Sequence, residues 1–352
     1  MFVLRSAAPS DHEQLQPLAA QLDTVNLPHD ACALAEILHL SERSFLGQVP
    51  REHARFLFCL EDPSSGRILG CSMLMAEHGN THDPHHFFQI DVDQRHSYTL
   101  QRQFEHRTLT FRQIFNAPHS ELGALILDPP LRGHPQRLGR LLSLGRMLFI
   151  AARPDNFCPT VQAELLPPFE SDGSSLLWEW LGRRFTGLSY ADADRLSRTN
   201  HEFMTALFPQ VPLHTSLMPV DVQAAIGSVG PATLGVARLL HSQGFRFNQH
   251  IDPFDGGPHL EARVSDIPIV RDARTRTVIT DAPVHTQELG VPNVPALVGR
   301  LDNGRWRCIC LPLPPIADDP QGISLPRDAC HALLVGNGDE VLVSTLQRSP
   351  DP

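Results

Sequence analysis

The chain contains no lysine, so all 29 of its basic side chains are arginines. A Walker-type phosphate loop, Schiff-base catalysis and pyridoxal-phosphate attachment all require a lysine amine, and these chemistries are therefore excluded. No apolar run approaches the length of a membrane span, and no basic N-terminal segment leads into an apolar stretch. We therefore expect a cytoplasmic protein without membrane association.

The chain has few cysteines and an excess of acidic over basic side chains. The seven cysteines are scattered and include no C-x-x-C pair, which excludes a zinc signature of that type and a disulfide framework. The formal net charge of −10 argues against nucleic acid as a partner, because phosphate backbones select basic surfaces. A hydrophobic content of 41% is typical of a globular protein.

Apolar periodicity predicts an α/β chain of two parts. Residues 1–262 read as a mixed domain of strands and helices, and residues 263–352 read as a small all-β unit of short strands broken by Pro, Gly and Asp. The main expected elements are a strand at 2–5, helices near 10–25 and 29–46, an antiparallel hairpin of 54–60 and 67–76, and a helix over 138–152 that exposes Arg140, Arg146 and Arg153. Further strands are expected near 108–114, at 122–127 and 160–165, and at 278–280 in the second part.

The connector between the strand at 122–127 and the following helix is glycine- and arginine-rich, with Arg132, Gly133, Arg137 and Gly139. The first N–H groups of a helix lack intrahelical partners and can bind a phosphate through the backbone. An arginine adds a bidentate donor for the same group. Taken alone, the connector fits a phosphate loop and an ordinary basic turn equally well.

Longer motifs separate these alternatives. Gln243-Gly-Phe-Arg246 is followed by Ile251-Asp-Pro-Phe-Asp-Gly-Gly-Pro-His-Leu-Glu261, and both come after Leu125-Ile-Leu-Asp-Pro129, Ala163-Glu164, Leu181-Gly-Arg-Arg-Phe185 and Ala225-Ile-Gly227. In these motifs and their order the chain resembles the arginine N-succinyltransferase family, a branch of the GNAT acyl-CoA N-acyltransferase superfamily.

The resemblance implies a GNAT-type mixed central sheet flanked by helices, and transfer of a succinyl group from succinyl-CoA to the α-amine of L-arginine in arginine catabolism. Succinyl-CoA would be a co-substrate, with no permanently bound cofactor, and the chain would assemble with copies of itself or with a related subunit. The residues expected to bind CoA are Leu125, Ile126, Leu127, Arg132, Gly133, Arg137, Leu138, Gly139 and Arg140.

The chain departs from the family at two positions. Val229-Gly230-Pro231 stands where the family has a proton-donating histidine between Val and Pro, and Leu166 stands where it has an arginine. A different acyl-CoA or amine, or a CoA-binding partner subunit without activity, is therefore an alternative. The candidates for proton transfer are His214, Glu164 and Tyr190. For Glu164, the alternative role is a purely structural hydrogen bond.

Histidine is abundant, with 19 residues, and five of them gather at positions 78, 82, 85, 86 and 96. Such a group of histidines is a candidate metal-binding site. However, Gly79, Asn80 and Pro84 indicate a loop here, and the resemblance brings no metal with it. We expect no metal, with the gathering a matter of chance.

Overall fold

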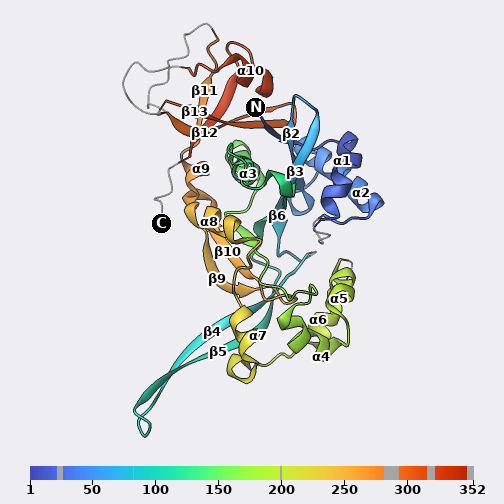
Figure 1. Cartoon of the computed structure of the whole chain (residues 1–352), viewed down its shortest axis with the longest axis vertical. Coiled ribbons are helices and arrows are strands. Elements are labelled where there is room, and N and C mark those ends of the chain that lie inside the picture. Colours follow the sequence, from blue (N-terminus) through green and yellow to red (C-terminus); the bar gives the residue numbers. More distant parts are fainter. Residues whose placement is uncertain (22–26, 82, 199, 281–292, 315–321, 347–352) are drawn as a thin grey trace. The chain divides into compact units, whose positions relative to one another are not determined.

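The computed structural model describes residues 1–21, 27–81, 83–198, 200–280, 293–314 and 322–346 (Figure 1). The chain divides into two compact units, each built from separate stretches of sequence. Unit 1 comprises residues 1–77, 120–159 and 263–352, and unit 2 comprises residues 78–119 and 160–262. In the described parts of the chain, no helix combines the length and apolar character needed to cross a membrane.

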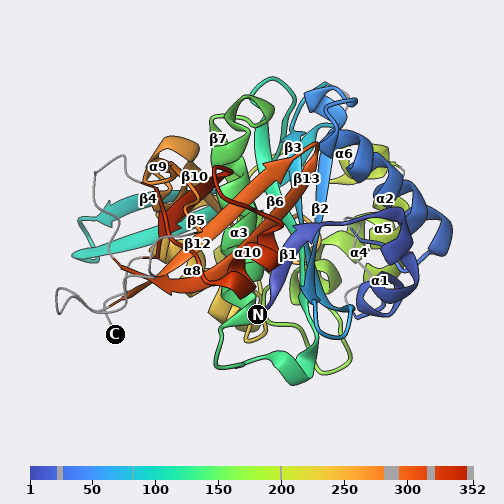
Figure 2. The ribbon, with the colours of Figure 1, turned by 90° about the horizontal axis from the view of Figure 1, so that it is seen from above.

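Unit 1 is a sheet with strand order β11-β14-β12-β13-β1-β2-β3-β6 and with helices packed against it (Figure 2). Its strands are β1 (Val3–Ser6), β2 (Arg55–Asp62), β3 (Arg67–His78), β6 (His119–Leu127), β11 (Arg274–Thr277), β12 (Val294–Asp302), β13 (Arg305–Leu313) and β14 (Glu340–Thr345), and its helices are α1 (His12–Ala19), α2 (Ala31–Phe45), α3 (Leu138–Ala152), α9 (Pro268–Arg271) and α10 (Arg327–Leu333).

The elements with clear sequence periodicity are confirmed. Strands β2 and β3 form the predicted antiparallel hairpin. Helix α2 begins after Asp30, whose carboxylate accepts a hydrogen bond from the Ala33 N–H at 2.8 Å, as an N-cap residue does. Helix α3 covers the predicted range, but its arginines are wrongly assigned to its exposed side: Arg146 is only 2% exposed, and Arg140 and Arg153 are half-buried.

The segment after residue 263 is β-rich, as predicted, but it also contains α9 and α10. Its strands β12, β13 and β14 share an apolar core with α10, and β13 pairs antiparallel with β1 at Leu4↔Cys308. The strand expected at 278–280 is reduced to one β-bridge between Val278 and Ile323. The division of the chain at residue 262/263 into two domains stays a prediction.

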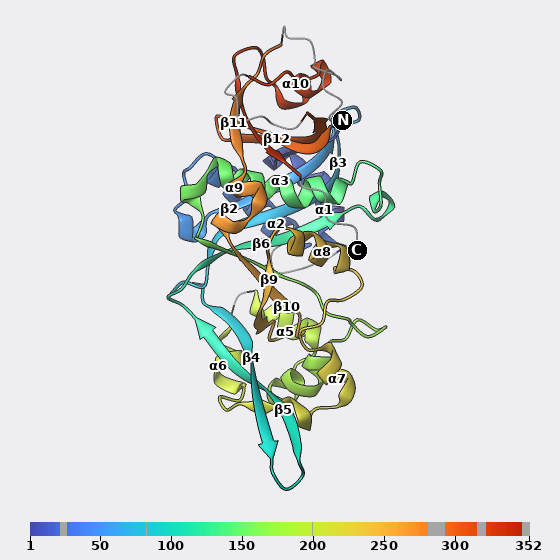
Figure 3. The ribbon, with the colours of Figure 1, turned by 90° about the vertical axis from the view of Figure 1, so that its left-hand side faces the viewer.

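Unit 2 has the strand order β7-β10-β9-β4-β5-β8. Strands β4 and β5 pair along their whole length and extend as a long hairpin (Figure 3), although the sequence indicated only a strand near 108–114. The strands are β4 (His85–Ser97), β5 (Arg102–Ile114), β7 (Thr160–Glu164), β8 (Leu213–His214), β9 (Arg246–Ile251) and β10 (Pro258–Arg263), and the helices are α4 (Arg183–Thr186), α5 (Tyr190–Ser197), α6 (Glu202–Leu207), α7 (Val220–Ala225) and α8 (Leu234–Ser242).

An apolar core holds the helices of unit 2 to its sheet. The fully buried Trp178 lies at its centre, and its indole N–H donates a hydrogen bond to the Leu188 carbonyl at 3.0 Å. The Trp178 ring stacks on Phe254 with centroids 5.1 Å apart. A polar indole can be buried this deeply because its N–H is satisfied. This core fixes the sheet strands that carry the histidines described below.

Candidate functional site

The segment expected to bind CoA lies in unit 1, where β6 leads into α3. Leu125 and Leu127 are half-buried on β6, with Ile126 buried between them. The connector residues Arg132, Gly133 and Arg137 are all exposed to solvent. An exposed connector in front of a 15-residue helix meets the requirements for binding an anion at a helix N-terminus.

Arg137 occupies an unusual backbone conformation at the start of α3. Its φ of 50° and ψ of 52° are left-handed, where glycine is the usual residue. Directly after it, Leu138 is buried and anchors the helix, while Gly139 and Arg140 are half-buried. Burial lowers the pKa of Arg140 from its ordinary value. Arg137 thus stands at the N-cap position of α3 with an exposed side chain.

A buried arginine supports the strand that carries Leu125. Ala124 on β6 has a positive φ of 47°, which interrupts the regular strand. Arg146 of α3 donates hydrogen bonds from Nη1 to the Gly123 carbonyl and to the Met73 carbonyl of β3, both at 2.9 Å. Burial lowers the pKa of Arg146 to about 9. Arg146 is therefore a positioning residue for the strand beside Leu125.

In unit 2 the sheet brings together a group of histidines around Glu164. We call this group the histidine cluster; its members are His78, His85, His119, His250 and His259. The Glu164 carboxylate, 33% exposed at the end of β7, lies 3.5 Å from His259 Nε2 and 3.9 Å from His85 Nδ1. The Gln162 amide donates to the same oxygen at 3.3 Å. The cluster thus places a carboxylate and neutral nitrogen bases at one location.

Burial sets the charge state of the cluster. It lowers the pKa of His119 to about 3 and that of His250 to about 4, with a further contribution from neighbouring histidines for His119. Burial and the neighbouring histidines also hold the pKa values of His85 and His259 well below the ordinary value near 6.5. These imidazoles are therefore neutral at pH 7, the form that accepts protons or binds metals.

The other two candidates for proton transfer lie elsewhere in unit 2. His214 is on β8, which pairs with β5, and its ring lies 6.1 Å from that of His106. In the strand order, β8 and β7 are at opposite ends, so His214 and Glu164 are not brought together. Tyr190 begins α5 and packs against Phe169, and burial raises the pKa of its phenol. The predicted roles of all three side chains stay predictions.

Gly230 is tightly enclosed. Its N–H donates to the Leu166 carbonyl at 2.8 Å, and a Cβ at this position would lie 2.4 Å from the Pro167 carbonyl oxygen. Real Cβ atoms do not approach backbone this closely. The two departures from the family motif, at 166 and 230, are therefore in direct backbone contact. No side chain larger than hydrogen fits at 230 without moving residues 166–167.

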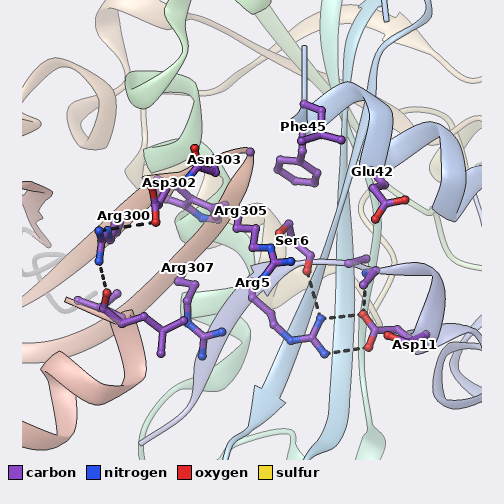
Figure 4. Close-up of a pocket in the computed structure, with 18 residues that line it drawn as sticks. Arg5, Ser6, Asp11, Glu42, Phe45, Arg300, Asp302, Asn303, Arg305 and Arg307 are labelled. Atoms are coloured by element: carbon purple, nitrogen blue, oxygen red, sulfur yellow. Dashed lines mark hydrogen bonds and ion pairs between the residues drawn. The ribbon is translucent and has the colours of Figure 1, made fainter. Parts of the chain in front are cut away.

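Unit 1 also contains a polar cavity of about 740 Å³ (Figure 4). Arg5, Arg300, Arg305 and Arg307 line it. The Arg5 guanidinium is held by Asp11, through contacts of 2.7 and 2.8 Å, and by Glu61. None of the residues that line the cavity belongs to the segment expected to bind CoA.

Comparison with known proteins identifies the family. The family model described as "Arginine N-succinyltransferase beta subunit" matches residues 2–269. The chain belongs to the arginine N-succinyltransferase family. An arginine N-succinyltransferase of Photorhabdus laumondii is 31% identical over 349 residues, which cover 98% of each chain. The arginine N-succinyltransferase subunit alpha of Pseudomonas aeruginosa is 31% identical over 359 residues, covering 97% of this chain and 98% of the relative.

A solved structure agrees with this assignment. The arginine/ornithine succinyltransferase subunit AI of Pseudomonas aeruginosa covers 98% of both chains, with a TM-score of 0.81 and 29% sequence identity. The likeness therefore extends over the whole fold, including the segment after residue 269 that the family model does not match. The resemblance read from the motifs between Leu125 and Glu261 is confirmed.

Sequence reasoning missed most of the histidine cluster. Of the five histidines grouped by sequence, only His78 and His85 belong to it; His86 faces His201 and Phe111, His96 lies beside Tyr98 on the β4–β5 hairpin, and His82 lies outside the described residues. His119, His250 and His259 come from distant strands. Their proximity depends on the strand order, which local sequence patterns do not reveal.

Proposed function

We propose that the protein transfers a succinyl group from succinyl-CoA to the α-amine of L-arginine. The observation that carries this proposal is the family match over residues 2–269, with relatives named arginine N-succinyltransferase that align over nearly the whole chain. We also propose that the mixed sheet follows the GNAT arrangement. In that arrangement CoA binds at the β6–α3 segment, through the backbone of Leu125–Leu127 and the connector residues up to Arg140.

The reaction is a direct acyl transfer. The neutral amine attacks the thioester carbonyl, a C–N bond forms, the C–S bond breaks, and one proton leaves the nitrogen. Backbone N–H groups of β6 would polarise the carbonyl oxygen, as donors in an oxyanion hole do. We assign the proton to Glu164, which also supplies a negative charge for a cationic substrate. The buried, neutral His259 Nε2 lies 3.5 Å from this carboxylate.

The leaving thiolate needs less assistance. Gly230 has no side chain to donate a proton, and the loss of one general acid costs roughly 10²–10⁴-fold without abolishing a reaction. A CoA thiolate is already a good leaving group. Tyr190 is a poor replacement, because a phenol with a raised pKa gives up its proton less readily. His214 remains a candidate donor.

Two alternatives follow from Leu166 and Gly230, which are in backbone contact. One is use of a different acyl-CoA or amine, and the other is CoA binding without turnover as the partner of an active subunit. Assembly with like or related subunits is part of the proposal, supported by the subunit naming of the Pseudomonas aeruginosa relative.

Release of free CoA thiol from succinyl-CoA in the presence of L-arginine tests the proposal. The Glu164→Gln variant is expected to lower kcat roughly 100-fold or more, since it removes the proton acceptor and keeps the shape. Glu202→Gln, an exposed glutamate of α6, is the matched control and should retain full activity. No release above background by the unmodified protein would contradict the proposal.

The same assay separates the alternatives. Release with another amine or thioester, but not with L-arginine and succinyl-CoA, would indicate a changed substrate. CoA binding measured by calorimetry, without turnover on any amine, would indicate a partner subunit. If Glu164→Gln were as active as the unmodified protein, the proposed acyl transfer would still hold, but Glu164 would not be its proton acceptor.

A further inference from the structure

Three rings of the histidine cluster bring nitrogen atoms close together. His78 Nε2 lies 3.1 Å from His85 Nδ1. The His119 ring lies 4.8 Å from the His85 ring and 5.5 Å from the His78 ring, measured between centroids. One nitrogen from each of the three rings falls within 4.8 Å of the other two. The rings come from the end of β3, the start of β4 and the start of β6.

The short nitrogen–nitrogen distance suits a shared metal ion. Zn²⁺ binds imidazole nitrogen at about 2.0–2.1 Å in tetrahedral geometry, which separates two ligand nitrogens by about 3.3 Å. The 3.1 Å between His78 and His85 is close to this separation. A hydrogen bond between the two rings has a similar length. The distance alone therefore does not distinguish a metal site from a hydrogen bond, and the surroundings of the pair must be considered.

The surroundings of His78 match those of a metal ligand. Its Nδ1 lies 2.9 Å from an Asp83 carboxylate oxygen. A carboxylate on the outer nitrogen is the usual partner of a zinc-binding histidine, because it fixes the tautomer and orients the ring. With the proton on Nδ1, the lone pair of Nε2 points at His85. This is the form in which imidazole binds a metal.

The other two rings are buried, and among the described residues only His119 of the two has an unpaired nitrogen: His85 Nδ1 faces His78 Nε2, and His85 Nε2 lies 3.3 Å from the Gln162 amide nitrogen. His85 is 2% exposed and His119 is 6% exposed. Within the described part of the chain, His119 Nε2 has no hydrogen-bond partner. Buried polar atoms are nearly always paired, so an unpaired imidazole nitrogen beside two others requires an explanation.

We propose that His78, His85 and His119 bind one divalent transition-metal ion of the Zn²⁺ type, through one imidazole nitrogen each. Nitrogen donors select such ions over Mg²⁺ and Ca²⁺, which prefer oxygen. Three protein ligands leave a fourth position for water or another ligand, as in open zinc sites. The acyl transfer itself requires no metal, although Glu164 lies 3.9 Å from His85 Nδ1.

Zinc titration of the chelator-treated full-length protein, against a competing indicator dye, tests the site. One equivalent of Zn²⁺ is expected to bind, and Co²⁺ in its place should give the visible absorption of a four-coordinate nitrogen site. His85→Gln and His119→Gln should each weaken binding by roughly 100-fold or more, and Asp83→Asn by about 10–100-fold.

The matched control is His86→Gln. His86 follows His85 on β4, but its ring faces His201 and not the proposed metal site. It should leave Zn²⁺ affinity unchanged. Circular dichroism of each metal-free variant checks that it folds; if a variant does not, the Co²⁺ spectrum of the unmodified protein decides. The proposal would be overturned if the unmodified protein bound no stoichiometric Zn²⁺, or if His85→Gln and His119→Gln kept the affinity of the unmodified protein. None of these readouts uses CoA or arginine, so failure of the acyl transfer would not affect them.

Discussion

Arg137 shows how a single residue combines backbone strain with charge. Its left-handed φ of 50° carries a cost for any residue with a Cβ, typically about 1–2 kcal/mol. The residue stands at the N-cap of α3, where the helix dipole favours an anion. We therefore propose that Arg137 binds the CoA pyrophosphate, in addition to the backbone.

Arg137→Ala should weaken CoA binding roughly 10-fold, because a charge-assisted hydrogen bond is lost. Arg137→Gly removes the same charge and relieves the backbone, so it separates the two effects: comparable weakening in both variants assigns the loss to the guanidinium. Isothermal titration with CoA measures this, with Arg153→Ala at the other end of α3 as the control. Unchanged affinity in Arg137→Ala would mean that the connector is only a turn.

Arg146 is the second residue whose environment decides its role. It is buried, and its guanidinium binds two carbonyls that would otherwise lack these donors. Replacing it with Met removes the buried charge but leaves both carbonyls without that partner. We expect Arg146→Met to lower the free energy of unfolding by about 3 kcal/mol, measured by urea denaturation. A loss no larger than that of Arg153→Met would show that Arg146 does not support β6.

At the scale of elements, β1 and the start of α1 are joined by the pair of Arg5 and Asp11 (Figure 4). Asp11 is 5% exposed, and burial alone would raise the pKa of its carboxyl. Hydrogen bonds from Arg5 and from the Ala8 N–H outweigh burial and hold that pKa below its ordinary value. The pair therefore stabilises the fold whenever Asp11 is ionised.

Asp11→Asn should lower the free energy of unfolding by about 3 kcal/mol at neutral pH. The folded-state pKa lies below the unfolded value near 3.9, so this stabilisation is complete above that value and is lost as pH falls through the folded pKa. Urea denaturation at pH 7, 5, 4 and 3 should show the difference between the two proteins shrinking below about pH 4. A constant difference would contradict this account.

The exposed pair of Asp93 and Arg95 on the β4–β5 hairpin is the control for this series. Its contact distance of 2.7 Å is the same as that of Arg5 and Asp11, but both side chains are more than half exposed. Solvent screens such a pair. Asp93→Asn should leave the free energy of unfolding nearly unchanged at every pH.

The elements also show what local sequence can predict. Helix α3 and the β2–β3 hairpin were predictable because their apolar residues recur at helical or strand spacing next to clear turn signals. Strand β4 was not, because most of its second half is exposed and polar, and only its pairing with β5 keeps it extended. Arg146 was wrongly predicted to be exposed, because a charged side chain normally lies at the surface. Here the guanidinium is buried because two carbonyl groups accept its hydrogen bonds.

At the scale of the whole molecule, the family and the reaction class could be predicted from the sequence, since long motifs survive in order between Leu125 and Glu261. The histidine cluster could not, because its members are up to 181 positions apart, from His78 to His259, and only the folded chain brings them together. Composition likewise indicated an abundance of histidine, but not which rings are buried and neutral.

The most direct test of the central claim is product identification. Purified protein is incubated with succinyl-CoA and L-arginine, and the mixture is examined by mass spectrometry alongside the Glu164→Gln variant. The account predicts N2-succinylarginine and free CoA in equal amounts, with the yield of the variant reduced roughly 100-fold. Intact succinyl-CoA and unmodified arginine after prolonged incubation with correctly folded protein would contradict it.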